Sequence, residues 1–333
     1  IKELARHPVG GGQFTSVVVP PPPQGITNTE AFASIYALDS NAGVLYRVPK
    51  AGGALETFLR PDDRFNGLEV GMVKAQAWRI DNIIAIAQNT EGGPFSFYFR
   101  SGEDWSFSNL GGSEEWGRVG NRFHAVNYDG NLYVWGALAG QLLKYTSGHF
   151  ADFPLPWIQD ESGRKIDAVI DLAIDGFVYL LQPDGHILVY SAGAFEREIV
   201  PAELTPPLVT PASFFVTGAD PESGSIFLVD TNNERIIQIN KQTGALIQQV
   251  RARPDEALRL DQLTSVYVDE SASRLTLYLV NGDRILSAAL PDPPAPFRES
   301  APAGPNGTTA PPGTAGPASS SEPAPTSAPA ATP

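Results

Sequence analysis

The chain has 333 residues, a formal net charge of −14 and no cysteine. The absence of cysteine excludes disulfide bonds and thiolate metal sites, and the acidic balance argues against nucleic acid or an anionic membrane surface as a partner. No apolar stretch reaches the length of a membrane span, so the sequence predicts no direct insertion of this segment into a bilayer.

The chain begins with two segments that we expect to be strands. Residues 13–19 resemble residues 262–268, so they are predicted to be the first strand of a repeated unit. Residues 1–9 then have no partner ahead of that unit. We expect them to complete the last sheet and to close a ring, because an unpaired sheet edge invites association with other chains. The prolines at 20–23 predict an exposed, rigid loop.

From residue 34 onward, short apolar strands recur in pairs that are joined by turns. Residues 34–39 and 43–48 form one such pair, and residues 225–230 and 235–239 form another. One equivalent position per copy falls every 46 to 51 residues, at Tyr36, Ile84, Tyr133, Tyr179, Phe227 and Tyr278. A period of about 40–50 residues with several strands in each unit is typical of β-propeller blades.

Each unit divides into four strands. A first strand precedes the pair, as at residues 123–127, and a fourth follows it, as at residues 245–250. Asp-Gly turns such as Asp129-Gly130 supply the positive φ angles that tight hairpins need. Six units fill the chain to residue 290. We therefore predict an all-β fold over residues 1–290: a six-bladed β-propeller of four-stranded antiparallel blades, with the N-terminal strand closing the last blade.

Residues 291–333 differ in composition from the rest of the chain, being mostly Pro, Ala, Ser, Thr and Gly. Such a segment cannot bury a core, so it is predicted to be a disordered tail or linker. Its Ser and Thr residues and the triplet at Asn306 are candidate glycosylation sites. The chain starts with Ile rather than Met, which we interpret as a processed product or a segment of a longer protein.

The segment from residue 226 to 239 resembles the NHL repeat, which consists of an apolar strand, Asp, a short Asn-containing turn, Arg-Ile and a second strand. The matching positions are Asp230, Asn233 (or Asn232), Arg235 and Ile236. The resemblance implies a divergent bacterial member of this propeller family, and NHL propellers are usually recognition modules. We expect Asp230, Asn233 and Arg235 to fix the turn through local hydrogen bonds.

Related six-bladed propellers include calcium-dependent lactonases, whose metal is held by oxygen ligands in the central channel. Asp171 lies inside a predicted first strand and is a weak candidate for such a ligand, although we predict no bound metal. His124 also lies in a first strand, where it either lines the channel or has a structural role. Trp105 and Trp116 lie in a polar stretch, residues 101–120, that we interpret as a long loop. They are candidate ligand or partner contacts, with packing against neighbouring blades as the alternative.

Three functions are consistent with these features. The first is a non-catalytic recognition or scaffold propeller outside a bacterial cell or at its surface. It would bind a protein or glycan, or form the sensor part of a larger signalling protein. The second is a calcium-dependent, lactonase-type hydrolase with its site in the channel. The third is a structural surface subunit that assembles by strand addition. We favour the first and expect no catalytic residues and no cofactor.

Overall fold

The computed structural model describes most of the chain up to residue 294. The described residues are 1–20, 33–65, 67–79, 82–89, 93–101, 104–117, 119–120, 123–138, 140–159, 164, 166, 168–271 and 274–294. The predicted tail, residues 291–333, lies outside the described residues except for its first four positions. The candidate glycosylation triplet at Asn306 and most of the polyproline run also lie outside them.

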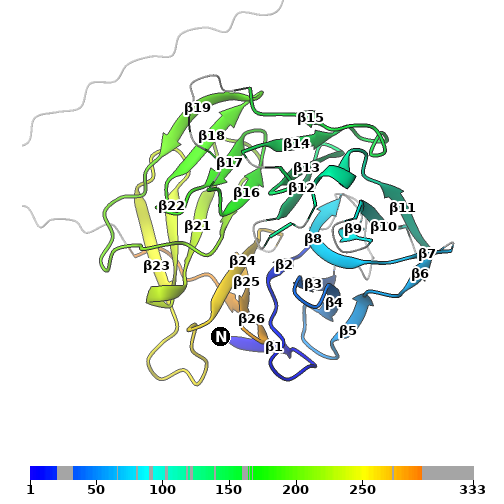
Figure 1. Cartoon of the computed structure of the whole chain (residues 1–333). Helices are drawn as coiled ribbons and strands as arrows, with labels where there is room; N and C mark the ends of the chain where they lie inside the picture. Colours follow the sequence, from blue (N-terminus) through cyan, green and yellow to red (C-terminus); the bar gives the residue numbers. More distant parts are fainter. Residues whose placement is uncertain are drawn as a thin grey trace, which may run out of the picture. The chain divides into compact units, whose positions relative to one another are not determined.

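Six four-stranded antiparallel sheets surround a central axis, as the sequence period predicts (Figure 1). Blades 1 to 3 comprise β2 (Ser16–Val18), β3 (Ser34–Asp39), β4 (Val44–Pro49) and β5 (Glu56–Leu59); β8 (Met72–Arg79), β9 (Asn82–Gln88), β10 (Phe95–Ser101) and β11 (Asp104–Asn109); and β12 (His124–Tyr128), β13 (Asn131–Trp135), β14 (Leu142–Tyr145) and β15 (Leu155–Pro156). Blades 4 to 6 comprise β16 (Asp171–Ile174), β17 (Val178–Leu181), β18 (Ile187–Ser191) and β19 (Ala194–Ile199); β20 (Phe214–Val216), β21 (Ser225–Asp230), β22 (Arg235–Asn240) and β23 (Leu246–Arg251); and β24 (Leu263–Asp269), β25 (Thr276–Asn281), β26 (Arg284–Ala289) and β1 (Lys2–Arg6).

The remaining described elements are short. β6 (Arg64–Phe65) and β7 (Leu68–Glu69) form a small hairpin between blades 1 and 2, and two single turns of 3-10 helix are η2 (Ser113–Glu115) and η3 (Thr231–Asn233). Within the described part of the chain, no helix has the length and apolar character that crossing a membrane requires.

The innermost strands form a closed ring. β2, β8, β12, β16, β20 and β24 contact one another in that order, and β24 contacts β2 again. Side chains alternate along each strand and fill the junctions between neighbouring blades. Each of the six junctions holds one cluster of buried apolar residues. The core of this protein is therefore divided among six blade junctions, which hold the ends of the strands in fixed positions.

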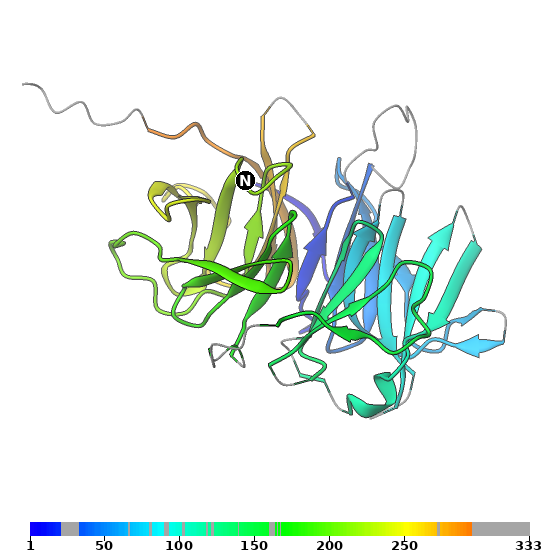
Figure 2. The same ribbon diagram turned by 90° about the horizontal axis from the view of Figure 1, so that it is seen from above.

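The N-terminal strand closes the ring as predicted. β1 pairs with β26 from Lys2↔Ser287 to Arg6↔Arg284, so blade 6 takes its fourth strand from the start of the chain. Figure 2 shows the ring from the side, with this strand beside the last strands of the chain. His7 continues the strand into the junction with blade 1, and a Cβ at Gly12 would lie 2.2 Å from its ring. Glycine at position 12 is therefore required by this close approach.

One local expectation was wrong. The stretch 101–120 is not one long loop, because residues 104–109 form β11, the outermost strand of blade 2, and pair with β10 along its length. The tight hairpin at Asp129-Gly130 forms as expected, with φ angles of 49° and 74°.

Candidate functional site

The structure brings together two residues that the sequence suggested for different roles. His124 is the first residue of β12 and Asp171 is the first residue of β16, the neighbouring innermost strand. Their side chains meet, with His124 Nδ1 3.3 Å from Asp171 Oδ1. They form a polar pair at one end of the inner ring, and their side chains are 28% and 16% exposed.

Asp171 connects three successive blades. Its Oδ1 accepts a hydrogen bond from the Leu172 amide in its own strand, and its Oδ2 accepts one from the Phe214 amide at the start of β20, at 2.8 and 3.1 Å. Burial raises the pKa of Asp171 above its usual value, and His124 and the two amides offset that effect only in part. Among the described residues, no group donates to or accepts from the buried Nε2 of His124.

The geometry of this pair favours an interblade tie over a calcium site. Calcium takes roughly six to eight oxygen ligands, whereas this pair offers one carboxylate whose two oxygens already accept backbone amides. The described residues include no group of three or more acidic or histidine side chains placed to hold a metal ion. The carboxylate orients the imidazole with Nδ1 toward it, which is a common structural use of aspartate.

The raised pKa of Asp171 predicts a definite pH dependence of stability. An acid whose pKa is higher in the folded state contributes stability that is complete below its unfolded pKa and is lost as pH rises through the folded pKa. Replacing Asp171 with asparagine removes this titration. The difference in unfolding free energy between wild type and Asp171→Asn should therefore fall as pH rises from about 4. Urea unfolding between pH 3.5 and 7 measures it, and Asp255→Asn makes the same substitution at an exposed position as the control.

The two tryptophans suggested as ligand contacts lie in apolar packing. Trp116 is 6% exposed and packs against Phe95 and Phe123 in the junction between blades 2 and 3. Trp105 lies in β11 and is half-buried, with its ring 5.2 Å from that of Phe58 in blade 1. Both tryptophans thus pack against neighbouring blades, which the sequence analysis gave as the alternative to ligand contact. The Trp116 ring presents almost no surface to a partner, and Trp105 is partly exposed.

The turn that resembles the NHL repeat is built around a buried ion pair. Arg235 Nε donates to Asp230 Oδ2 at 2.7 Å, and both side chains are 0% exposed. The guanidinium also donates to Gln249 Oε1 and to the Pro206 carbonyl at 2.6 and 2.5 Å. Asn233 Nδ2 donates to Asp230 Oδ2 at 2.8 Å. These contacts join the β21–β22 turn to the outermost strand of blade 5 and to the chain that arrives from blade 4.

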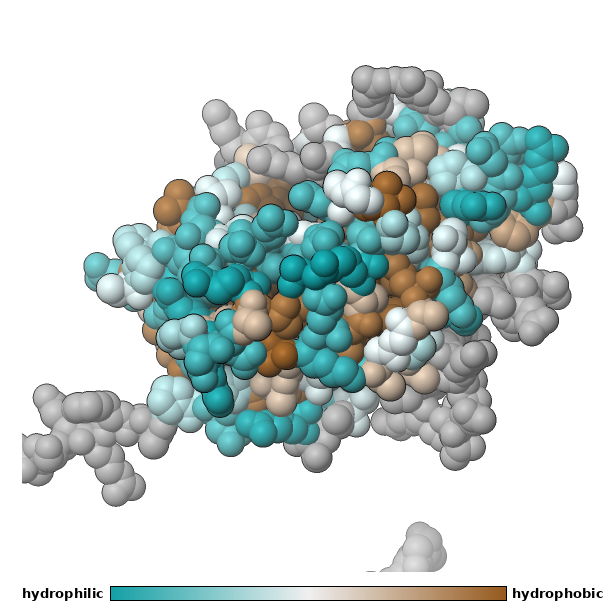
Figure 3. All heavy atoms as spheres, turned by 90° about the horizontal axis from the view of Figure 1, so that it is seen from below, coloured by the Kyte–Doolittle hydropathy of each residue, from teal (hydrophilic) through white to brown (hydrophobic). Residues whose placement is uncertain are grey.

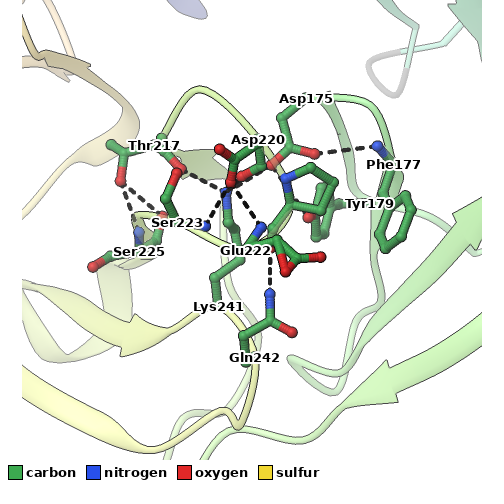
Figure 4. Close-up of polar contacts among 12 residues, drawn as sticks. Asp175, Phe177, Tyr179, Thr217, Asp220, Glu222, Ser223, Ser225, Lys241 and Gln242 are labelled. Atoms are coloured by element: carbon green, nitrogen blue, oxygen red, sulfur yellow. Dashed lines mark hydrogen bonds and ion pairs between the residues drawn. The ribbon is translucent and has the colours of Figure 1, made fainter. Parts of the chain in front are cut away.

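Sequence reasoning missed a second buried cation, Lys241, which follows β22 (Figure 4). Its Nζ donates to Asp175 Oδ2, to the Thr217 carbonyl and to the Asp220 carbonyl, at 2.7, 2.8 and 2.7 Å. The Lys241 and Asp175 side chains are 1% and 7% exposed. Asp175 belongs to blade 4 and Lys241 to blade 5, so this pair locks the junction between them.

The same tie recurs at the junction between blades 6 and 1. Lys50 follows β4 and donates to Asp269 Oδ2 at 2.7 Å, with side chains 21% and 9% exposed. Strand register places Lys50 at the position of Lys241 and Asp269 at the position of Asp175. Burial would raise the pKa of Asp269, but hydrogen bonds from Lys50 and Ser271 outweigh burial and hold it below its usual value. Aligning the units on this lysine is the sequence signal that would have found both ties.

Comparison with known proteins identifies the fold. No protein family and no curated protein matches the sequence. Among solved structures, a protein of unknown function from Bacteroides thetaiotaomicron is 11% identical, with 86% of this chain and 71% of that chain covered and a TM-score of 0.56. The major allergen Mala s 1 of Malassezia sympodialis is 11% identical over 77% of this chain and 89% of that chain, with a TM-score of 0.51. The WD40 propeller domain of Doa1 is 15% identical over 86% and 96%, with a TM-score of 0.48.

The closed ring of six sheets and these likenesses define the class: the protein is a six-bladed β-propeller. At this level of identity the likenesses establish the fold alone, since one propeller scaffold serves many unrelated functions. The resemblance to NHL repeats is specific to the turn of blade 5, and membership of that family stays a prediction.

Proposed function

We propose that this chain is a non-catalytic recognition propeller that binds a protein partner through the loops at the ends of its blades. One observation carries the proposal: in the described part of the chain, the charged side chains that are buried pair with one another within and between blades. These ties are His7–Asp39, Lys50–Asp269, His124–Asp171, Lys241–Asp175 and Arg235–Asp230. Groups held in this way stabilise a rigid scaffold, and rigid scaffolds present binding loops.

The surface supports recognition by polar loops. Hydrophilic residues cover most of the face in Figure 3, and hydrophobic residues show between them in small areas. The most exposed large apolar residues, such as Phe153 at 71% and Val209 at 65%, are distributed over different blade connections. Scattered apolar residues are normal on a soluble surface. We therefore assign partner binding to polar and charged loop residues, with a glycan as the alternative ligand.

The proposal extends to location. A cysteine-free propeller followed by a Pro-rich segment fits a module displayed outside a bacterial cell, either alone or as the sensor part of a larger signalling protein. Assembly by strand addition is less favoured, because β1 completes blade 6 of its own ring and would first have to leave it. A lactonase-type activity is the enzymatic alternative, with the channel as its site.

The test separates binding from catalysis. The full chain is used to capture partners from an extract of the source cell surface, and each captured protein is purified and titrated against the chain by calorimetry. We expect saturable binding with one site per propeller. In parallel, elemental analysis measures bound calcium and a panel of lactones is screened for hydrolysis. Turnover that depends on calcium would overturn the proposal in favour of the hydrolase.

A further inference from the structure

Three arginines line one groove on the outer part of the ring, although the chain as a whole carries a net charge of −14. The groove has a volume of about 470 Å³ and lies between the β21–β22 turn and the loop that follows β23. We call it the arginine groove. Its lining residues are Asn232, Asn233, Glu234, Arg251, Ala252, Arg253, Pro254 and Arg259.

One wall of the arginine groove is held rigidly. The η3 turn begins at Asp230, whose side chain accepts from the Asn233 amide, and ends at Glu234, which has a left-handed φ of 51°. Asn233 also donates to the Pro207 carbonyl at 3.1 Å. Beneath the turn, Arg235 is fully buried and pairs with Asp230. A non-glycine residue with positive φ persists only where its surroundings determine it, so the wall keeps its shape before any partner arrives.

The three guanidinium groups differ in whether an ion pair within the protein holds them. Arg259 is held by Glu234 through contacts of 2.8 and 3.2 Å to its two carboxylate oxygens. Arg251 and Arg253 are exposed, and neither forms an ion pair within the described residues. Asp255 and Asp261 lie in the same loop, but they do not line the groove. Two exposed guanidinium groups without an ion pair among the described residues therefore lie beside a third that Glu234 holds in place. Together they form a site for oxygen anions.

We propose that the arginine groove binds an acidic segment of a protein partner, which deepens the recognition function proposed above and rests on it. Planar guanidinium groups bind carboxylates through two parallel hydrogen bonds. The chain as a whole carries a net charge of −14, so two exposed guanidinium groups in one groove give such a segment a local attraction that orients the partner. A nucleic acid fits less well, because its many phosphates would extend beyond three arginines along a protein whose net charge is −14.

The experiment measures fluorescence anisotropy of a labelled octaglutamate peptide with the full chain at low and at physiological salt. We expect binding that weakens as salt rises. The double variant Arg251→Ser/Arg253→Ser should weaken binding about tenfold or more, since it removes two charge-assisted contacts. Its melting temperature should stay close to wild type, because both side chains are exposed. The matched control is Arg60→Ser/Arg64→Ser, which makes the same change in charge at side chains 65% and 72% exposed.

Each other outcome contradicts the proposal in a distinct way. Equal binding by both double variants would place the peptide elsewhere on the protein. Displacement of the peptide by millimolar inorganic phosphate, or tighter binding of a single-stranded oligonucleotide, would assign the groove to phosphates. No binding of octaglutamate would remove the arginine groove as a site. A partner captured and titrated as described above would in that case still support recognition, through another surface.

Discussion

Replacing Lys241 with methionine should lower the free energy of unfolding by about 3–5 kcal/mol, the usual cost of removing one partner from a buried ion pair. The variant leaves the Asp175 carboxylate buried without its cation. It also removes the donor to the Thr217 and Asp220 carbonyls. Methionine nearly matches the length of lysine, so the loss comes from charge and hydrogen bonding rather than from a cavity. Equilibrium urea unfolding at pH 7 measures the change.

Two further variants show whether charge is the cause. Adding Asp175→Asn to Lys241→Met removes the unpaired charge, so the double variant should recover part of the loss. Lys50→Met breaks the equivalent tie at the junction of blades 6 and 1, where the lysine side chain is 21% exposed and, among the described residues, donates only to Asp269. We expect a smaller loss there because the lysine is more exposed, so that water already screens part of its attraction to the carboxylate. A loss below about 1 kcal/mol for Lys241→Met would show that the buried tie contributes no more than a surface ion pair does.

The repeat made most of the fold predictable from the sequence. Six copies at a nearly constant period fixed the number of blades, and the likeness of residues 13–19 to residues 262–268 left the N-terminal segment as the closing strand. The outermost strand of blade 2 was missed because its composition is polar. Trp105 and Phe107 alternate with serine in β11 and pack toward blade 1. That period of two was present in the sequence and is the ordinary signal of a half-buried strand.

The polar pairs were harder to predict because they join different blades. His124 and Asp171 occupy the same position in consecutive units, so they become neighbours only when blades 3 and 4 pack side by side. Lys241 and Asp175 are 66 residues apart and come from different positions of their units. The dipeptide Asp175-Gly176 indicated only a hairpin turn. Contacts between blades depend on how each blade is rotated relative to the next, and a pattern of strands does not specify that rotation. Contacts within one turn follow instead from local hydrogen bonding.

Deleting residues 1–9 should lower the melting temperature by about 10 °C or more, the shift expected for a loss of roughly 5 kcal/mol in a domain of this size. The deletion exposes the β26 edge and removes Leu4 and Ala5 from the core, where they are 5% and 9% exposed. It also removes His7, whose Nε2 lies 3.2 Å from Asp39 Oδ2 in blade 1. Leu4→Ala alone should cost about 2–5 kcal/mol, whereas the outward-facing Arg6→Ser should cost little.

A synthetic peptide of residues 1–9 gives the decisive measurement. A ligand that binds only the folded state raises the melting temperature with its concentration. The peptide should therefore restore stability to the truncated ring, and a Leu4→Ser peptide should restore less. The exposed β26 edge also invites pairing between copies, so the truncated chain should form dimers that the peptide dissolves. An unchanged melting temperature after deletion would mean that five four-stranded blades and a three-stranded sixth blade hold the ring without its closing strand, and the structural role of β1 would have to be abandoned.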